Sequence, residues 1–243
     1  MTGSPLLVVE ARLGPGVRGG FTLARPDVDG PAHNLSLTVG DPSGVPARRA
    51  ALEAWLGAPV AYARQVHGRE VFVCRRVPAQ TPEADALVTT GSATAVAVLV
   101  ADCVPVLLAD AEAGVVAAVH AGRRGVVAGV VPAAVAAMLE LGARAGRLRA
   151  VVGPAVCGAC YEVPGALQQE VVETVPTAMS TTSWGTPALD LPGAVRAQLA
   201  AAGVSVEATG ACTLEDPRWF SHRAGSARAV GRFAAAVRAL PPD

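Results

Sequence analysis

The feature that most constrains the fold is a set of three nearly continuous apolar runs at the centre of the sequence. Residues 94–101 (TAVAVLVA), 104–109 (VPVLLA) and 115–119 (VVAAV) are built almost entirely of Val, Ala and Leu. A strand with one solvent-facing side alternates apolar and polar residues, whereas a strand buried on both faces is apolar throughout. We therefore expect three strands that are covered on both sides.

Weaker patterns on either side of these runs predict the remaining elements. Proline near the first turn and glycine just past the end are typical of helices. Strands that cluster first and then alternate with helices predict an α+β or mixed α/β fold, with helices packed on a mixed sheet in one compact domain over residues 1–243. The expected helices are 46–56, 126–141, 164–175 and 192–202, and the expected further strands are 6–11, 20–23 and 149–152. Residues 204–208 and 228–235 are expected to be the last strands or the ends of strand–helix units. Residues 60–66 and 70–77 are expected to form a hairpin with His67 in its turn.

Composition excludes several classes of protein. Hydrophobic residues make up 51% and charged residues 16%, which is enough apolar surface for a core and excludes a disordered chain. Twenty basic and twenty acidic residues cancel, so we expect no nucleic-acid or membrane partner. Neither a signal peptide nor a membrane-spanning run is apparent. Five scattered cysteines are typical of reduced thiols, so we expect a cytoplasmic protein.

Two of the four histidines and one cysteine share a setting that suits metal binding. His67 and His120 each end a predicted strand beside a small residue, and Cys103 interrupts two apolar runs. Two imidazoles and one thiolate can hold zinc and leave a fourth position for water or substrate. The alternative is an inert buried thiol with two hydrogen-bonded histidines, because the spacing alone does not bring His67 near Cys103.

Three further features carry possible chemistry. Asp102 is a carboxylate within an apolar stretch, where it could orient a histidine, carry a proton or cap a turn. Arg123 and Arg124 join a strand to a helix, so they could bind an anion or simply lie in solvent. Cys157 and Cys160 have CxxC spacing, but the sequence offers no second pair, so a structural or redox role there is the minor interpretation.

Several short motifs in a fixed order resemble those of the laccase-domain family, once described as polyphenol oxidases and later as purine nucleoside phosphorylases. Each motif alone is weak, but the ordered set is specific and extends from residues 34–36 (NLS) and 39–41 (VGD) to Arg232. The motifs between these ends are 64–68 (RQVHG), 84–89 (ADALVT), 101–105 (ADCVP), 119–122 (VHAG), 153–155 (GPA), 160–163 (CYEV), 189–191 (LDL), 212–213 (CT), 220–221 (FS) and 231–232 (GR).

The resemblance implies a one-domain CNF/YfiH-like fold and a zinc enzyme that acts on small molecules. It implies phosphorolysis of adenosine, inosine, guanosine and methylthioadenosine, and deamination of adenosine; some members are credited instead with removing wrongly incorporated amino acids from cell-wall precursors. The implied zinc ligands are His67, Cys103 and His120. We expect Cys103, His120 and Asp102 to be catalytic, and Asn34, Arg64, Gln65 and Arg124 to bind nucleoside or phosphate.

Two positions depart from the family pattern. Arg123 stands where the family usually has Trp after His-Ala-Gly, and His222-Arg223 replaces a pair of arginines after Phe-Ser. The first change makes one wall of the expected pocket more cationic and less able to stack a flat ring. Both changes affect the choice of substrate more than the binding of metal.

Three other functions use the same residues. A copper oxidase is suggested by the old family name, but a multicopper centre needs on the order of ten imidazoles and this chain has four histidines, so copper is less favoured than zinc. A metal-free cysteine hydrolase would use Cys103 as nucleophile and His120 as base. The remaining alternative is a metal-binding or partner-binding protein without catalytic activity.

Overall fold

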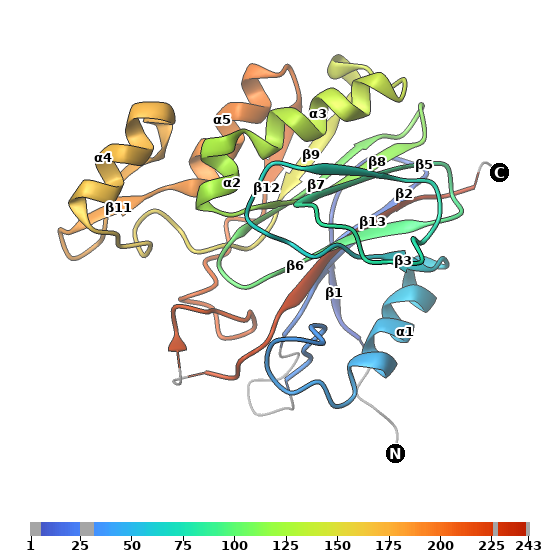
Figure 1. The fold of residues 1–243 in the computed structure, drawn as a ribbon, viewed down its shortest axis with the longest axis horizontal. Helices are drawn as coiled ribbons and strands as arrows, with labels where there is room; N and C mark the ends of the chain where they lie inside the picture. Colours follow the sequence, from blue (N-terminus) through green and yellow to red (C-terminus); the bar gives the residue numbers. More distant parts are fainter. Residues whose placement is uncertain (1–5, 25–31, 226–227, 242–243) are drawn as a thin grey trace.

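The computed structural model describes residues 6–24, 32–225 and 228–241, and these form two stacked sheets with helices on the outside (Figure 1). The larger sheet has the strand order β12-β9-β7-β8-β5-β4. Its inner strands pair antiparallel, while the outermost pair at each edge is parallel. The strands are β12 (Ser205–Ala208), β9 (Arg149–Val152), β7 (Val104–Asp110), β8 (Val115–Ala121), β5 (Ala86–Thr90) and β4 (Val71–Cys74).

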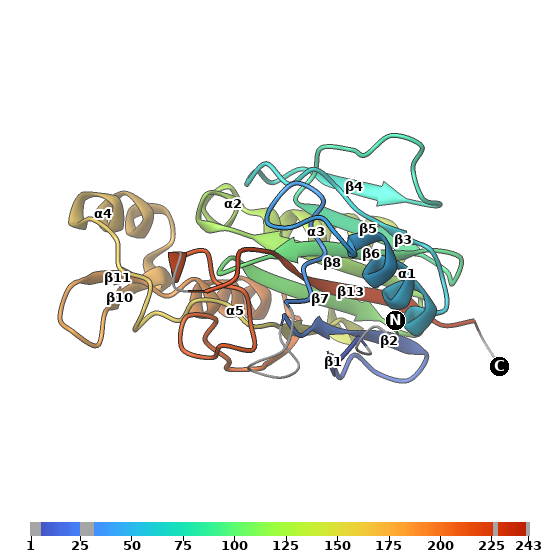
Figure 2. The same cartoon turned by 90° about the horizontal axis from the view of Figure 1, so that it is seen from below.

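The smaller sheet has the order β1-β2-β13-β6-β3, and a separate pair of short strands, β10 and β11, lies beside α4 (Figure 2). All pairs in the smaller sheet are antiparallel except β6 with β3. The strands are β1 (Val8–Glu10), β2 (Val17–Thr22), β13 (Phe233–Ala239), β6 (Ala95–Val100), β3 (Val60–Ala61), β10 (Met179–Thr181) and β11 (Pro187–Leu189).

Each sheet has one face against the other sheet and one face against helices. On β8, Val116 and Ala118 pack against the smaller sheet, while Ala117 and Val119 lie on the opposite face, where helix α3 packs. Helix α1 covers the outer face of the smaller sheet. This layering explains why β6, β7 and β8 are apolar on both faces, as the sequence predicts. The helices are α1 (Val45–Leu56), α2 (Arg123–Ala128), α3 (Val130–Glu140), α4 (Gly165–Thr174) and α5 (Leu191–Ala201).

The mixed α+β class is confirmed, but two predicted elements are wrong in detail. The expected hairpin of residues 60–66 and 70–77 does not form, because β3 belongs to the smaller sheet and β4 to the larger one. The expected helix 126–141 is two helices divided at Gly129, whose φ of 82° is left-handed. None of the helices in the described part of the chain is long and apolar enough to cross a bilayer.

Candidate metal centre and its cleft

His67, Cys103 and His120 come together in the region where the chain passes from the smaller sheet to the larger one. Cys103 lies in the short link between β6 of the smaller sheet and β7 of the larger one. His120 is the penultimate residue of β8, and His67 lies between β3 and β4, which also belong to different sheets. His67 and Asp102 both have positive φ, at 60° and 80°, so each link turns sharply beside the site.

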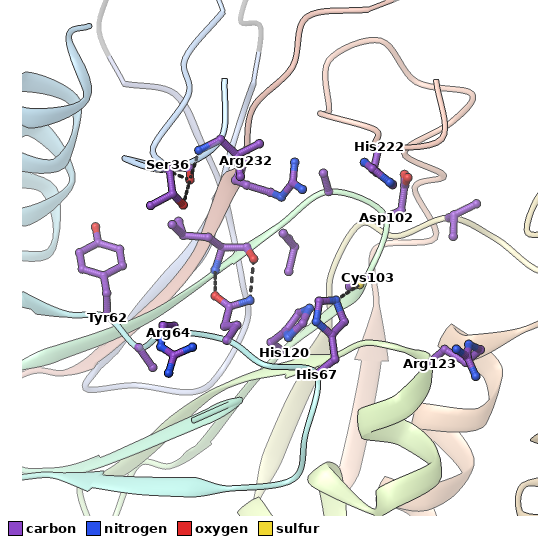
Figure 3. A pocket seen from close by; sticks show the side chains of 18 of the residues that line it. Ser36, Tyr62, Arg64, His67, Asp102, Cys103, His120, Arg123, His222 and Arg232 are labelled. Carbon is purple, nitrogen blue, oxygen red and sulfur yellow. Dashed lines mark hydrogen bonds between the residues drawn. The ribbon is translucent and has the colours of Figure 1, made fainter. Parts of the chain in front are cut away.

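The three side chains form one compact group (Figure 3). One ligand atom from each residue lies within 4.8 Å of the others. The Sγ of Cys103 is 3.8 Å from His67 Nε2, and the two imidazole rings meet edge to face with centroids 4.7 Å apart. His120 is buried, Cys103 is partly buried and His67 is exposed, so the group is open to solvent on the His67 side. The sequence alone did not indicate whether His67 lies near Cys103, and the structure places the two side chains side by side.

Asp85 is the residue that orients this group, and sequence analysis gave it no role. Its buried carboxylate accepts a hydrogen bond from His120 Nδ1 at 2.7 Å. The same carboxylate accepts from three successive backbone N–H groups, those of Val66, His67 and Gly68. A carboxylate behind a histidine ligand fixes its tautomer and its ring orientation. Because Nδ1 of His120 is engaged, Nε2 is the nitrogen left to bind a metal.

The electrostatics of the three side chains favour a thiolate beside an imidazolium. Burial opposes ionisation of the Cys103 thiol, but hydrogen bonds to His120 and His67 and the positive charge of both rings lower its pKa to about 6. Burial also disfavours a charged His120, yet hydrogen bonds to Asp85 and Cys103, with their negative charges, raise its pKa to about 9. A deprotonated thiol is the form that binds a metal ion.

Gly122 leaves a small space beside the three candidate ligands. A Cβ added at Gly122 would lie 2.7 Å from Cδ2 of His67 and 3.2 Å from Sγ of Cys103. Only glycine leaves this space free, and its φ of −74° requires no glycine for conformational reasons. Three ligands of the types that hold catalytic zinc, with space beside them, fit a transition-metal ion that keeps an open position.

A cleft of about 800 Å³ opens from this group. Its wall combines aliphatic side chains, two tyrosines and several cationic groups, a mixture typical of a pocket for a small organic molecule. Ser36, Tyr62 and Arg64 lie at one end in Figure 3, and Asp102, Arg123 and His222 at the other. The three predicted metal ligands line the cleft between these ends.

The predicted substrate residues divide into two groups. Arg64 and Gln65 line the cleft, and Arg64 pairs with Glu83. The Gln65 amide also forms two hydrogen bonds of 2.8 Å with the backbone of Leu99, which ties its loop to β6. Asn34 lies outside the cleft lining and its side chain bonds to backbone groups of its own loop and to the N–H of Arg232. Asn34 therefore holds two loops together.

The two arginines after His-Ala-Gly point in different directions. Arg123 lines the cleft, whereas Arg124, the residue expected to bind phosphate, is exposed and lies outside the lining. Three more guanidinium groups line the cleft, those of Arg49, Arg223 and Arg232. Arg223 covers the ring of Tyr161, with Cζ 4.4 Å from the ring centroid, and Arg232 is partly buried and forms no ion pair within the described residues.

Asp102 and the CxxC pair have partners that the sequence did not reveal. The Asp102 carboxylate accepts hydrogen bonds from Thr213 Oγ1 at 2.6 Å and from the N–H of Arg223 at 2.7 Å. Orientation of His120, one role considered for Asp102, belongs to Asp85. Cys157 and Cys160 lie beside Cys212 and Glu215, which come from a later loop, so the expectation that the pair lacks partner ligands is wrong.

Residues 24–239 match the family described as multi-copper polyphenol oxidoreductase laccase. The chain belongs to this family. Members similar to it are named purine nucleoside phosphorylases: one from Streptomyces griseus is 52% identical over 212 residues, covering 84% of this chain and 85% of the relative. Another, from Streptomyces coelicolor, is 50% identical over 211 residues, covering 84% and 86%.

Solved structures of this family share the fold. A Neisseria meningitidis protein described as a DUF152 protein superposes with a TM-score of 0.84 at 31% identity, covering 98% of this chain and 100% of the other. The YlmD protein of Geobacillus stearothermophilus gives a TM-score of 0.79 at 27% identity, covering 97% and 100%. The expected family and fold are confirmed.

Proposed function

We propose that this protein is a zinc-dependent enzyme that cleaves purine nucleosides with phosphate. The observation that carries the proposal is the convergence of His67, Cys103 and His120 at a cleft that several arginine side chains line. The two Streptomyces relatives, which are named purine nucleoside phosphorylases, support the choice of substrate. The substrates would be adenosine, inosine, guanosine and methylthioadenosine.

Zinc fits the ligand set better than copper does. Two imidazoles and a thiolate suit zinc with an open fourth position. A blue-copper centre adds a weak axial ligand, usually methionine or glutamine, to the same set. No methionine among the described residues lines the cleft, and both amide atoms of Gln65 are bonded to the backbone of Leu99. Four histidines in the whole sequence are too few for a multicopper centre. When bound, zinc would supply Lewis acidity toward an oxygen of the substrate or of water.

The residues of the chain would bind and orient the reactants. Asp85 fixes the His120 ring through Nδ1 and holds the backbone that carries His67. Arg123 would hold the attacking phosphate, because its guanidinium faces the cleft and a bidentate contact neutralises and orients an oxyanion. Arg232 would neutralise charge from the opposite wall. Asp102, beside Cys103, is our candidate for the proton carrier.

The same cleft would support deamination of adenosine. Deamination needs a purine nucleoside and water, and it needs no phosphate, so it makes no demand on Arg123. The two reactions would then share the ligands His67, Cys103 and His120 and differ in their need for cationic side chains. Phosphate dependence therefore separates them.

A metal-free cysteine hydrolase is the second candidate, and one observation favours it. Cys103, His120 and Asp85 form a chain of thiol, imidazole and carboxylate with a lowered thiol pKa of about 6. That arrangement activates nucleophilic cysteines in other enzymes. Such an enzyme would keep its full activity after metal removal and would lose it on alkylation of Cys103.

The test is product analysis with purified, zinc-loaded protein. Adenosine, inosine, guanosine and methylthioadenosine are incubated with and without phosphate, and the products are separated by chromatography. We expect free base and ribose 1-phosphate (methylthioribose 1-phosphate from methylthioadenosine) only when phosphate is present, and inosine from adenosine in either case. Absence of turnover with every nucleoside would overturn the proposal. Inosine as the sole product would reduce it to a deaminase.

A further inference from the structure

A second cluster of potential ligands lies outside the cleft. Cys157 and Cys160 belong to the loop between β9 and α4, and Cys212 and Glu215 belong to the loop after β12. One ligand atom from each of the four lies within 4.8 Å of those of the others. None of the four lines the cleft, so the cluster is separate from the His67, Cys103 and His120 group.

We propose that Cys157, Cys160, Cys212 and Glu215 form a structural zinc site. Three thiolates and one carboxylate are four ligands, which is the number that closes the coordination of structural zinc. The CxxC spacing is the one that structural zinc sites use for the first ligand pair. Soft thiolate ligands select zinc over the hard cations magnesium and calcium.

The local geometry suits a single ion. A tetrahedral zinc ion with Zn–S bonds of about 2.3 Å sets its sulfur atoms about 3.8 Å apart, within the spread of this cluster. The CxxC segment is a tight turn, in which the N–H groups of Cys160 and Tyr161 both donate to the carbonyl of Cys157.

The burial of the four residues is that of a structural site. Cys160 and Cys212 are each 6% exposed and pack with Val156 in a small apolar cluster, so water is excluded from one side. Glu215 is exposed and reaches inward, with Oε1 3.5 Å from Cys160 Sγ. A disulfide between Cys157 and Cys160 would use two of the thiols and leave Cys212 and Glu215 without a role.

The site would brace the wall of the catalytic cleft. Val156, next to Cys157, donates its N–H to the carbonyl of Asp102 at 3.1 Å. Thr213, next to Cys212, donates its hydroxyl to the Asp102 carboxylate. Each loop of the second cluster therefore donates a hydrogen bond to Asp102 from a residue next to one of its cysteines. Asp102 in turn directly precedes the proposed metal ligand Cys103. An ion that joins the two loops would fix Asp102 in its left-handed conformation.

The test is zinc content per chain, measured by elemental analysis of proteins purified with reductant and zinc. The wild type should hold two equivalents. Cys212→Ser and Cys103→Ser should each hold about one, since each removes a different site. Cys74→Ser is the matched control and should hold two, because Cys74 is a buried thiol of β4 that belongs to neither cluster and donates to the Arg76 carbonyl, as serine can.

Glu215→Ala is a second variant of the proposed site, chosen because this side chain is exposed and its loss should not unfold the protein. It should stay folded and bind its second zinc at least about 10-fold more weakly in competition with a chelator. Wild-type protein with one zinc that only Cys103→Ser removes would overturn the proposal, as would a Cys157–Cys160 disulfide found by mass spectrometry after purification with reductant and zinc. Since Cys103→Ser reports on the catalytic centre, failure of that centre is distinguishable from failure of this site.

Discussion

The Nδ1 of His120 donates a hydrogen bond to Asp85 Oδ1 over 2.7 Å, and the same oxygen accepts the backbone N–H of His67 at 2.9 Å. One buried carboxylate thus positions two of the three proposed metal ligands, one through its ring and the other through its backbone. A ligand set assembled from two links and the end of a strand depends on such a shared anchor, because the links can otherwise move independently of the strand.

Asp85→Asn should therefore weaken metal binding while the protein still folds. Asparagine has the same shape, but it has one acceptor oxygen in place of two, so it cannot serve His120 and the three backbone donors together. We expect zinc affinity to fall about 10–100-fold, measured by competition with a chromogenic chelator. Asp110→Asn is the matched control, because Asp110 is equally buried but lies at the far end of β7, and its zinc affinity should be unchanged.

Gly122→Ala tests whether the space beside the ligands is needed. The added methyl group would meet His67 and Cys103 at 2.7 and 3.2 Å, so one ligand must move. We expect lower zinc occupancy and at least about 10-fold lower turnover, with helicity unchanged by circular dichroism. Gly146→Ala, where a Cβ meets nothing within 4 Å, should behave as wild type. Equal activity of the two variants would contradict the proposed position of the ion.

Arg123→Ala and Arg124→Ala form a matched pair on one helical turn. Arg123 faces the cleft and Arg124 faces solvent. Loss of a charged contact to phosphate should cost about 2–3 kcal/mol, or roughly 30–150-fold in phosphorolysis at low phosphate. Arg124→Ala should stay within about 2-fold of wild type. Deamination of adenosine by Arg123→Ala should fall much less, and equal losses in both reactions would mean that Arg123 contacts the nucleoside.

Asp110 should contribute stability that depends on pH. It is buried at the end of β7, and burial disfavours its charged form. Hydrogen bonds from the backbone N–H groups of Ala113 and Arg144 and from the Arg147 side chain outweigh this effect. The pKa of Asp110 is therefore below its ordinary value of 3.8. Because the folded pKa is the lower one, this contribution is present above about pH 4 and is lost as the pH falls further.

Urea denaturation of Asp110→Asn from pH 7 to pH 3 checks this expectation. The variant should be less stable than wild type by about 2 kcal/mol at pH 7, and the difference should shrink below pH 4. Glu112→Gln is the control, since Glu112 pairs with the same Arg147 at an exposed position and should cost less than about 1 kcal/mol. A difference between Asp110→Asn and wild type that stays constant with pH would show that charge is not involved.

The central strands, and the positions of Cys103 and His120 at strand ends, could be predicted from sequence because their signals are local. An unbroken apolar run implies burial on both faces, and a His or Cys that ends such a run lies where the strand ends and a loop begins. The sequence could not predict which of the two sheets each strand belongs to, because a buried strand has the same apolar pattern in either sheet. The expected hairpin around His67 failed for that reason.

The rest of the site depends on contacts between distant segments. Asp85 directly precedes β5, where a carboxylate resembles an ordinary turn residue, and its role comes from His120 on the neighbouring strand β8. Cys212 and Glu215 are far along the chain from the CxxC pair. The choice between Arg123 and Arg124 depends on the orientation of the six-residue helix α2, which is too short for its apolar pattern to define a face.

The most direct test of the central claim is to measure zinc content and inosine phosphorolysis on the same preparations of wild type and Cys103→Ala. Wild-type protein stripped with a chelator should lose activity and regain it on addition of zinc. Cys103→Ala should hold one zinc fewer than wild type and turn over inosine at least about 100-fold more slowly, because a Lewis acid contributes several kcal/mol. Full phosphorolysis by stripped wild-type protein, or by Cys103→Ala, would contradict a metal-dependent reaction at His67, Cys103 and His120.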